Sequence, residues 1–156
     1  ECFSLRTAAD NFTPEEMREG IEFAHNMGKK VYITANIIPH NRDLKQMEKY
    51  FKEISDMGAD AVIISDLGAF NICKRVAPGL EIHISTQANN VNYRTYRFWH
   101  RLGAKRVVSA RELSLEEISE LRRNGYEIAS KMVKVKNRYG ETCRVKRYTL
   151  KGDARG

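Results

Sequence analysis

The hydrophobic and polar positions of this chain repeat one arrangement five times: an amphipathic stretch, a glycine, two or three residues, and then a short apolar run. The five glycines are Gly28, Gly58, Gly79, Gly103 and Gly125. A glycine directly after a helix can adopt the left-handed conformation that satisfies the last carbonyl groups of that helix. The chain is therefore predicted to consist of successive helix–strand units.

Capping residues predict where two of the helices begin. Thr13 is followed three residues later by Glu16, and Ser114 is followed at the same spacing by Glu117. In such a capping box the hydroxyl accepts a hydrogen bond from the helix backbone while the glutamate reaches back to the cap. Apolar residues at helical spacing then predict two buried stripes, which are Met17, Ile21, Phe23 and Ala24 in one helix and Leu44, Met47, Tyr50, Phe51 and Ile54 in a helix from Asp43.

Five short segments rich in β-branched residues are predicted as strands, namely 31–38, 61–65, 81–85, 106–110 and 126–129. Apolar runs without strict alternation suit parallel strands that are covered on both faces. The spacing of the units fits either a β/α barrel or an open doubly wound sheet. No glycine-rich phosphate loop follows any of the strands, and this favours the barrel.

The predicted fold class is α/β, with a partial TIM-like (β/α) barrel of parallel βα units over residues 1–129. A short basic β-hairpin and tail follow over residues 130–156, and they are compatible with a separate small β domain. A complete barrel needs about 250 residues and eight strands. We therefore expect a fragment, a shortened relative, or a sequence from which intervening residues are missing.

The net charge of +7 is concentrated at the end of the chain. Residues 131–156 hold 9 Lys and Arg against 2 Asp and Glu, whereas the preceding residues balance. Because clustered cations neutralise phosphate, the hairpin is predicted to bind nucleic acid. The alternative is a solvated cationic edge that prevents strand pairing between molecules. The candidate nucleic-acid-binding residues are Lys134, Lys136, Arg138, Arg144, Lys146 and Arg147.

Polar residues follow the predicted strands at the points where the strands end. In parallel β/α folds these ends share one edge, and ligands bind there. Amide, hydroxyl, carboxylate and guanidinium groups around one opening suit a small polar or anionic ligand. The candidate ligand-binding residues are Asn36, Asp66, Thr86, Gln87 and Arg111.

Structural roles compete with that interpretation. Asn36 and Asp66 are also suited to capping a loop or starting the next helix. Arg111 could form a structural ion pair with Glu112 or Asp66, or clamp a carboxylate or phosphate in bidentate fashion. For two histidines, a structural role and a catalytic role are also both possible. His83 lies in an apolar strand and is either a core residue or a catalytic base. His40 follows the first strand, where it is either a catalytic acid or base or a solvent-exposed side chain.

Several classes of function lack support in the residues. Three widely spaced cysteines show no metal-binding or redox pair, and Cys73 is expected to be a small buried hydrophobe. There is no nucleophile elbow, no zinc helix and no catalytic Cys-His signature, so the catalytic residues are unknown. No apolar run is long enough to span a bilayer, and the start of the chain does not resemble a secretory signal. We expect a cytoplasmic protein without a membrane partner.

Five blocks of this sequence resemble, in order and spacing, the collagenase-like peptidase family, which is number thirty-two among the peptidases of unknown catalytic type. They are ECFSLRTAADNFTPEEM, GKKVYITANIIPHN, GADAVIISDLGAF, LEIHISTQANNVN and LGAKRVVSARELSLEEI, and together they cover about residues 1–129. The chain departs from the family pattern twice: the family's opening strand is absent before Glu1, and the tail from Ser130 does not continue the barrel.

The resemblance implies one of three functions. The first is hydroxylation of the wobble uridine of tRNA with a prephenate-derived cosubstrate, as in the family's RNA-hydroxylating members, which also include one that modifies a ribosomal cytidine. The second is peptidase activity on polypeptides, and the third is binding of a ligand or RNA without turnover. We favour the first, with RNA and a small anionic cosubstrate as partners and the oligomeric state open. Some members hold an iron–sulfur cluster, but the cysteines that ligate it have no counterparts here. No cofactor is evident in this chain, and a cluster is expected only if the family's downstream cysteines exist.

Overall fold

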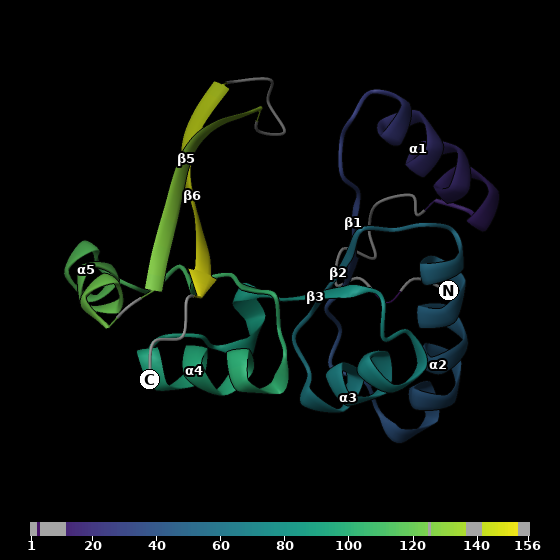
Figure 1. Ribbon diagram of the computed structural model, residues 1–156, viewed down its shortest axis with the longest axis horizontal. Coiled ribbons are helices and arrows are strands. Elements are labelled where there is room, and N and C mark those ends of the chain that lie inside the picture. The colour runs from purple at the N-terminus through teal and green to yellow at the C-terminus, as the bar shows by residue number, and fades with distance from the viewer. Residues whose placement is uncertain (1–2, 4–11, 125, 137–141, 153–156) are drawn as a thin grey trace. The chain divides into compact units, whose positions relative to one another are not determined.

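The structure is a computed structural model that describes residue 3, residues 12–124, 126–136 and 142–152. The chain forms two compact units, Glu1–Ala88 and Asn89–Gly156. The first unit contains α1 (Pro14–Asn26), β1 (Tyr32–Ala35), α2 (Asn41–Asp56), β2 (Ala61–Ile64), α3 (Leu67–Val76), β3 (Glu81–Ile84) and the short 3-10 helix η1 (Thr86–Ala88). The second contains α4 (Tyr93–Leu102), β4 (Arg106–Val107), α5 (Leu115–Arg123), β5 (Tyr126–Lys136) and β6 (Thr142–Gly152) (Figure 1).

The first unit is built on a parallel sheet. β1 pairs with β2 from Tyr32 opposite Ala61, and β2 pairs with β3 from Ala61 opposite Glu81. A helix lies between consecutive strands in the chain, so the strands all point the same way and their carboxyl ends share one edge. Together with β4 of the second unit the chain contains four parallel strands that alternate with helices. The predicted α/β class, with part of a β/α barrel, is confirmed.

The strands are shorter than the sequence predicted. β1 ends at Ala35 although the apolar segment runs on to Ile38, and β4 contains only two residues of its predicted five. Beyond β1, the backbone N–H of Ile37 donates to the carbonyl of Phe3 at 3.2 Å instead of to a neighbouring strand. Pro39 has no N–H with which to continue a ladder. The strand ends therefore leave room for loops that carry polar side chains.

The core of the first unit lies where α2 and α3 pack against the sheet (Figure 1). The predicted stripe of α2 is confirmed by Met47, Phe51 and Ile54, which are fully buried. In α1 Ile21 is buried, but Phe23 is 66% exposed, so its assignment to the buried stripe was wrong. Phe23 follows Ile21 by two residues, which turns it about 200° around the helix axis and away from the stripe.

Both predicted capping boxes are present. In α1 the amide of Glu16 donates to the hydroxyl of Thr13 at 3.2 Å, and the amide of Thr13 donates to the Glu16 carboxylate at 2.7 Å. At α5 the amide of Glu117 donates to the hydroxyl of Ser114 at 3.3 Å, and the amide of Ser114 donates to the Glu117 carboxylate at 2.7 Å. These reciprocal bonds explain why both helices begin where the sequence indicated.

Three of the five predicted helix-terminating glycines adopt a positive φ, namely Gly28, Gly58 and Gly103. Gly103 has φ of 98° as the C-cap of α4, where its N–H bonds back to the carbonyls of Trp99 and His100. Gly79 does not have a positive φ, because α3 ends earlier, at Val76 with Ala77 as its C-cap, and Gly79 lies in the turn that follows. Gly125 lies outside the described residues.

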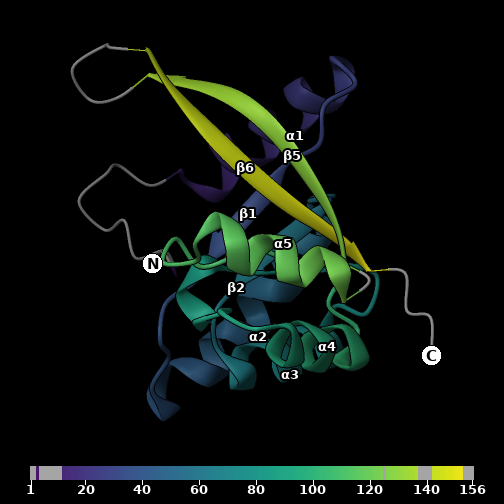
Figure 2. The same ribbon diagram turned by 90° about the vertical axis from the view of Figure 1, so that its left-hand side faces the viewer.

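The second unit ends in an antiparallel ribbon in which β5 pairs with β6, from Tyr126 opposite Gly152 to Lys136 opposite Thr142 (Figure 2). The predicted strand 126–129 is the first part of β5, and it pairs antiparallel with β6 rather than adding a fifth parallel strand. No glycine or proline interrupts residues 126–136, so one continuous strand forms. The division into domains at residues 129 and 130 stays a prediction.

Candidate functional site

Two of the predicted site residues meet at the carboxyl edge of the sheet in the first unit. The side-chain amide of Asn36, after β1, donates a hydrogen bond to the side-chain carbonyl of Gln87, in η1 after β3. Between them, after β2, the hydroxyl of Ser65 donates to the backbone carbonyl of Asn36 at 2.8 Å. The amide of Gln87 donates to the hydroxyl of Ser85 at 3.3 Å. A hydrogen-bonded polar row therefore runs across the ends of the three strands.

Asp66 lies at the same edge but has a structural role as well. One of its carboxylate oxygens accepts a hydrogen bond from the amide of Ala69 at 2.8 Å, so Asp66 is the N-cap of α3. A Cβ atom added at Gly68 would lie 3.0 Å from that same oxygen. The capping interpretation of Asp66 is confirmed, and a ligand at this edge would meet a carboxylate that is already fixed by the helix. Thr86, the first residue of η1, is half-buried beside Gln87.

Arg111 belongs to the second unit, where it is exposed in the turn between β4 and α5. It forms no ion pair with any described residue, so the structure does not support the proposed bridge to Glu112. The residue before it, Ala110, is buried and donates its N–H to the carbonyl of Asn90 at 3.2 Å. The backbone that carries Arg111 is thus held in place while the guanidinium group remains in solvent. Whether Arg111 binds a ligand together with the polar row stays a prediction.

Asn90 is the residue that the sequence analysis missed in this unit. It is fully buried, and its side-chain carbonyl accepts from the indole N–H of Trp99 at 3.0 Å while its amide donates to the carbonyl of Val108 at 3.2 Å. Its backbone carbonyl also accepts from the hydroxyl of Tyr96 at 3.1 Å. Burial raises the pKa of Tyr96, so this hydroxyl stays protonated and remains a donor. Asn90 therefore joins the loop after β3 to α4 and to the segment after β4.

The two histidines of interest have different environments. His83 is 2% exposed, its ring meets that of Tyr32 edge-on with centroids 4.8 Å apart, and its Nε2 lies 3.5 Å from the carboxylate of Glu81. The core interpretation of His83 is confirmed. His40 is exposed as the N-cap of α2, and its backbone N–H donates to the carboxylate of Asp43 at 2.8 Å. An exposed ring at a helix start fits solvation better than acid–base work.

Cysteine and metal chemistry have little support among the described residues. Cys73 is fully buried in α3, and burial raises the pKa of its thiol to about 12, so the thiol stays protonated. This confirms Cys73 as a core residue and does not fit a ligand of an iron–sulfur cluster. The described residues contain no group of three or more His, Cys, Asp and Glu that could hold a metal ion. None of the described helices has the length and apolarity that a membrane crossing requires.

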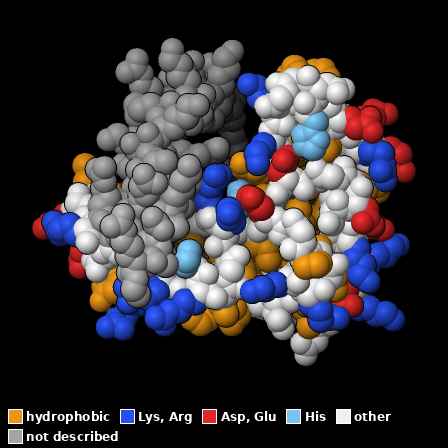
Figure 3. Space-filling model, in the orientation of Figure 1, with side chains coloured by type: hydrophobic (Ala, Val, Ile, Leu, Met, Phe, Trp, Pro, Cys, Tyr) orange, Lys and Arg blue, Asp and Glu red, His pale blue; other side chains and the backbone are white. Residues whose placement is uncertain are grey.

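The predicted nucleic-acid residues of the ribbon lie outside what the structure describes in side-chain detail. Lys134, Lys136, Arg144, Lys146 and Arg147 are placed by their backbone alone, and Arg138 lies outside the described residues. A second basic cluster went unnoticed in the sequence. Lys and Arg side chains gather over α4, at the lower left of Figure 3. A charge count in short windows would have found this cluster, whereas the sum over the first 130 residues hides it.

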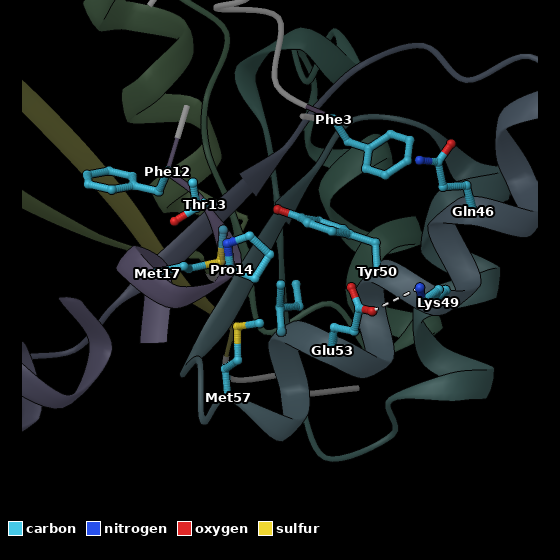
Figure 4. A pocket seen from close by; sticks show the side chains of 11 residues that line it. Phe3, Phe12, Thr13, Pro14, Met17, Gln46, Lys49, Tyr50, Glu53 and Met57 are labelled. Atoms are coloured by element: carbon cyan, nitrogen blue, oxygen red, sulfur yellow. Dashed lines mark ion pairs between the residues drawn. The ribbon is translucent and has the colours of Figure 1, made fainter. Parts of the chain in front are cut away.

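A cavity of about 440 Å³ opens between the start of α1 and one face of α2. Phe3, Pro14, Met17 and Tyr50 give it a largely apolar wall, and the ion pair between Lys49 and Glu53, 3.5 Å apart, lies at its rim (Figure 4). None of the predicted site residues lines it. It is therefore a separate feature from the polar row.

Comparisons with known proteins agree with the resemblance in the sequence. The model of peptidase family U32 matches residues 1–134. The chain is 43% identical over 120 residues to "tRNA hydroxylation protein P1" of Bacillus subtilis, a match that covers 77% of this chain and 28% of the relative. It is 45% identical over 120 residues to "tRNA hydroxylation protein P" of Escherichia coli, covering 77% and 26%. It is 41% identical over 121 residues to an "uncharacterized protease" of Methanocaldococcus jannaschii, covering 78% and 29%.

The chain spans between a quarter and a third of the length of these curated relatives. No solved structure matches it. The family model covers most of the chain, including the three strands whose ends carry the polar row and all of α4. The chain therefore belongs to peptidase family U32.

Proposed function

We propose that this chain is part of a protein that hydroxylates tRNA, at the wobble uridine and with a prephenate-derived cosubstrate. The observation that carries the proposal is its identity of 43% and 45% with two bacterial proteins whose names state tRNA hydroxylation. The relatives named for tRNA hydroxylation are far longer proteins, so the chain is expected to contribute a part of the site. A tRNA substrate also implies that the protein acts in the cytoplasm.

The polar row provides the chemistry that a small carboxylate cosubstrate requires. Asn36 and Gln87 carry amide groups that can donate and accept in fixed directions, and their mutual hydrogen bond orients both. Arg111 has an exposed guanidinium group, which is suited to bidentate binding of a carboxylate. In this proposal the amides of the first unit fix the orientation of the cosubstrate, and Arg111 of the second unit is proposed separately as an anion-binding residue. No catalytic residue is assigned.

Peptidase activity is the second candidate, because the archaeal relative is named as a protease. The described residues favour it less. A buried thiol with a raised pKa makes Cys73 unsuitable as a nucleophile. The hydrogen bond between His25 and Asp60, at 2.9 Å, joins the end of α1 to the residue before β2, which is the amino edge of the sheet. Catalytic groups in this type of fold lie at the opposite edge.

Mass spectrometry of tRNA tests the two candidates together. Cells that lack this gene should lose hydroxylation at the wobble uridine, and the wild-type gene should restore it. An Arg111→Ala gene should restore less, while Arg123→Ala, which removes an exposed arginine from the end of α5, should restore it fully. Unchanged hydroxylation in the deleted cells rejects the proposal. Cleavage of denatured collagen by the purified protein would then favour the peptidase.

A further inference from the structure

The segment from Asn89 to Ala110 differs in charge from the rest of the described chain. It holds five Lys and Arg residues and no Asp or Glu. They are Arg94, Arg97, Arg101, Lys105 and Arg106, and the first three belong to α4. No acidic residue within this segment offsets its five positive charges.

The three arginines of α4 form one face, which we call the arginine face. Their spacing of three and four residues places Arg94, Arg97 and Arg101 within about 60° of one another around the helix. All three are exposed, and they span roughly 10 Å along the axis. On the opposite side Tyr96 and Trp99 are buried, at 1% and 6% exposure. The core therefore orients the arginine face towards solvent.

None of the three arginines forms an ion pair with any described residue. The guanidinium of Arg94 lies 5.7 Å from the ring centroid of Tyr93, so its charge is stacked but not neutralised. Three like charges on one face repel one another, which lowers stability, and no ion pair with a described residue offsets this cost. A face that is kept in this state is suited to an anionic partner.

We propose that the arginine face binds the phosphate backbone of tRNA. This deepens the proposed function, on which it rests, because it gives the substrate a docking surface on this chain. Arginine is the side chain best matched to phosphate, which it binds with two parallel hydrogen bonds. Phe98, 48% exposed on the same side of α4, adds an aromatic surface on which a base can stack.

An anionic membrane is a poorer fit to this face. A helix that lies on a membrane inserts its apolar side among the lipids. In α4 the apolar side packs in the protein core and cannot insert into lipid, because Tyr96 and Trp99 are buried and both donate hydrogen bonds to Asn90. Phe98 alone gives too little apolar area for insertion.

α2 supplies a matched control. Lys45, Lys49 and Lys52 are also exposed on one helix face at spacings of four and three residues. The variant R94Q/R97Q/R101Q and the variant K45Q/K49Q/K52Q therefore remove the same charge from two helices. The complete chain and both variants would be titrated with tRNA between 50 and 200 mM salt, with thermal unfolding as the check on folding.

The arginine variant should bind tRNA roughly 10- to 100-fold more weakly than wild type at physiological salt, with a slope of log affinity against log salt that is smaller by about 2 to 3. The lysine variant should keep the wild-type slope within about 1. Equal losses in the two variants, a wild-type slope in the arginine variant, or no binding by the wild-type chain would overturn the proposal. Loss of binding to phosphatidylserine vesicles with unchanged tRNA binding would also overturn it, in favour of a membrane.

The result separates this inference from the proposed function. If the wild-type gene restores tRNA hydroxylation while the arginine variant binds normally, the arginine face is rejected and the proposed function stands. If the arginine variant loses binding although the gene never affects tRNA hydroxylation, the face is an RNA-binding surface and the proposed function fails.

Discussion

α2 and α4 bury similar faces and present different charges to solvent. α2 contains four Lys and Arg and four Asp and Glu, and it forms an ion pair along its length between Lys49 and Glu53 and another with Arg75 of α3. α4 contains three arginines and no acidic residue. The difference teaches that the buried face of a helix reflects the fold. The balance of charge on its outer face indicates whether that charge is neutralised within the protein or by a partner.

The largest expected loss of stability comes from a substitution on the buried face of α2. Phe51→Ala in α2 removes a fully buried ring and should lower the free energy of unfolding by about 3–5 kcal/mol. Phe98→Ala in α4 removes a ring that is 48% exposed and should cost less than about 1 kcal/mol. Urea denaturation measures both. Similar losses for the two variants would mean that the outer side of α4 is covered in solution.

A smaller effect is expected at the buried polar residue that holds α4. Asn90→Ala removes the side-chain acceptor of the indole N–H of Trp99 and the donor to the carbonyl of Val108, and it should lower the free energy of unfolding by about 1–3 kcal/mol. The emission of Trp99, the chain's one tryptophan, should shift as its hydrogen bond is lost. Asn71→Ala, at an exposed position in α3, is the control and should change neither quantity. An unchanged emission in the Asn90 variant contradicts the role assigned to this residue.

The smallest effect concerns a charge that the first unit neutralises itself. Burial raises the pKa of Asp60, but hydrogen bonds from His25 and from the N–H of Val31 outweigh it, and the net pKa is lowered. The unfolded chain then binds the proton more readily, so this contribution is present above the ordinary aspartate pKa near 4 and is lost as the pH falls through the lower folded value.

Asp60→Asn should therefore cost about 1–2 kcal/mol at pH 7 and should flatten the dependence of stability on pH below pH 4. Asp56→Asn, at an exposed position at the end of α2, should keep the wild-type profile. Thermal unfolding between pH 2 and 7 gives both curves. A wild-type slope in the Asp60 variant would show that another carboxylate carries the effect.

Local patterns in the sequence predicted most of the first unit. Capping boxes placed the starts of α1 and α5 correctly, because they depend on residues a few positions apart. Helical spacing identified α2, which begins at Asn41, two residues before the predicted start at Asp43. The shared edge of parallel strands also brought Asn36 and Gln87 together, 51 positions apart in the chain, as expected. The strand lengths were overestimated, since apolar residues continue into loops that the sheet does not pair.

What the sequence did not reveal depends on long-range contacts. Nothing in the sequence singled out Asn90, because only the fold brings Trp99 and Val108 to its side chain. The arginine face was hidden for a different reason, because charge was summed over 130 residues in which acidic residues elsewhere, such as the four glutamates of α1, cancel the arginines of α4.

Ultraviolet crosslinking of tRNA to the complete chain, followed by mass spectrometry of the linked peptides, tests most directly whether tRNA is the partner that neutralises α4. Linked nucleotides should map to peptides that contain Arg94 to Arg101, and R94Q/R97Q/R101Q should remove them. Links confined to α2, links that persist in the variant, or no links at all would contradict tRNA as the partner of this surface.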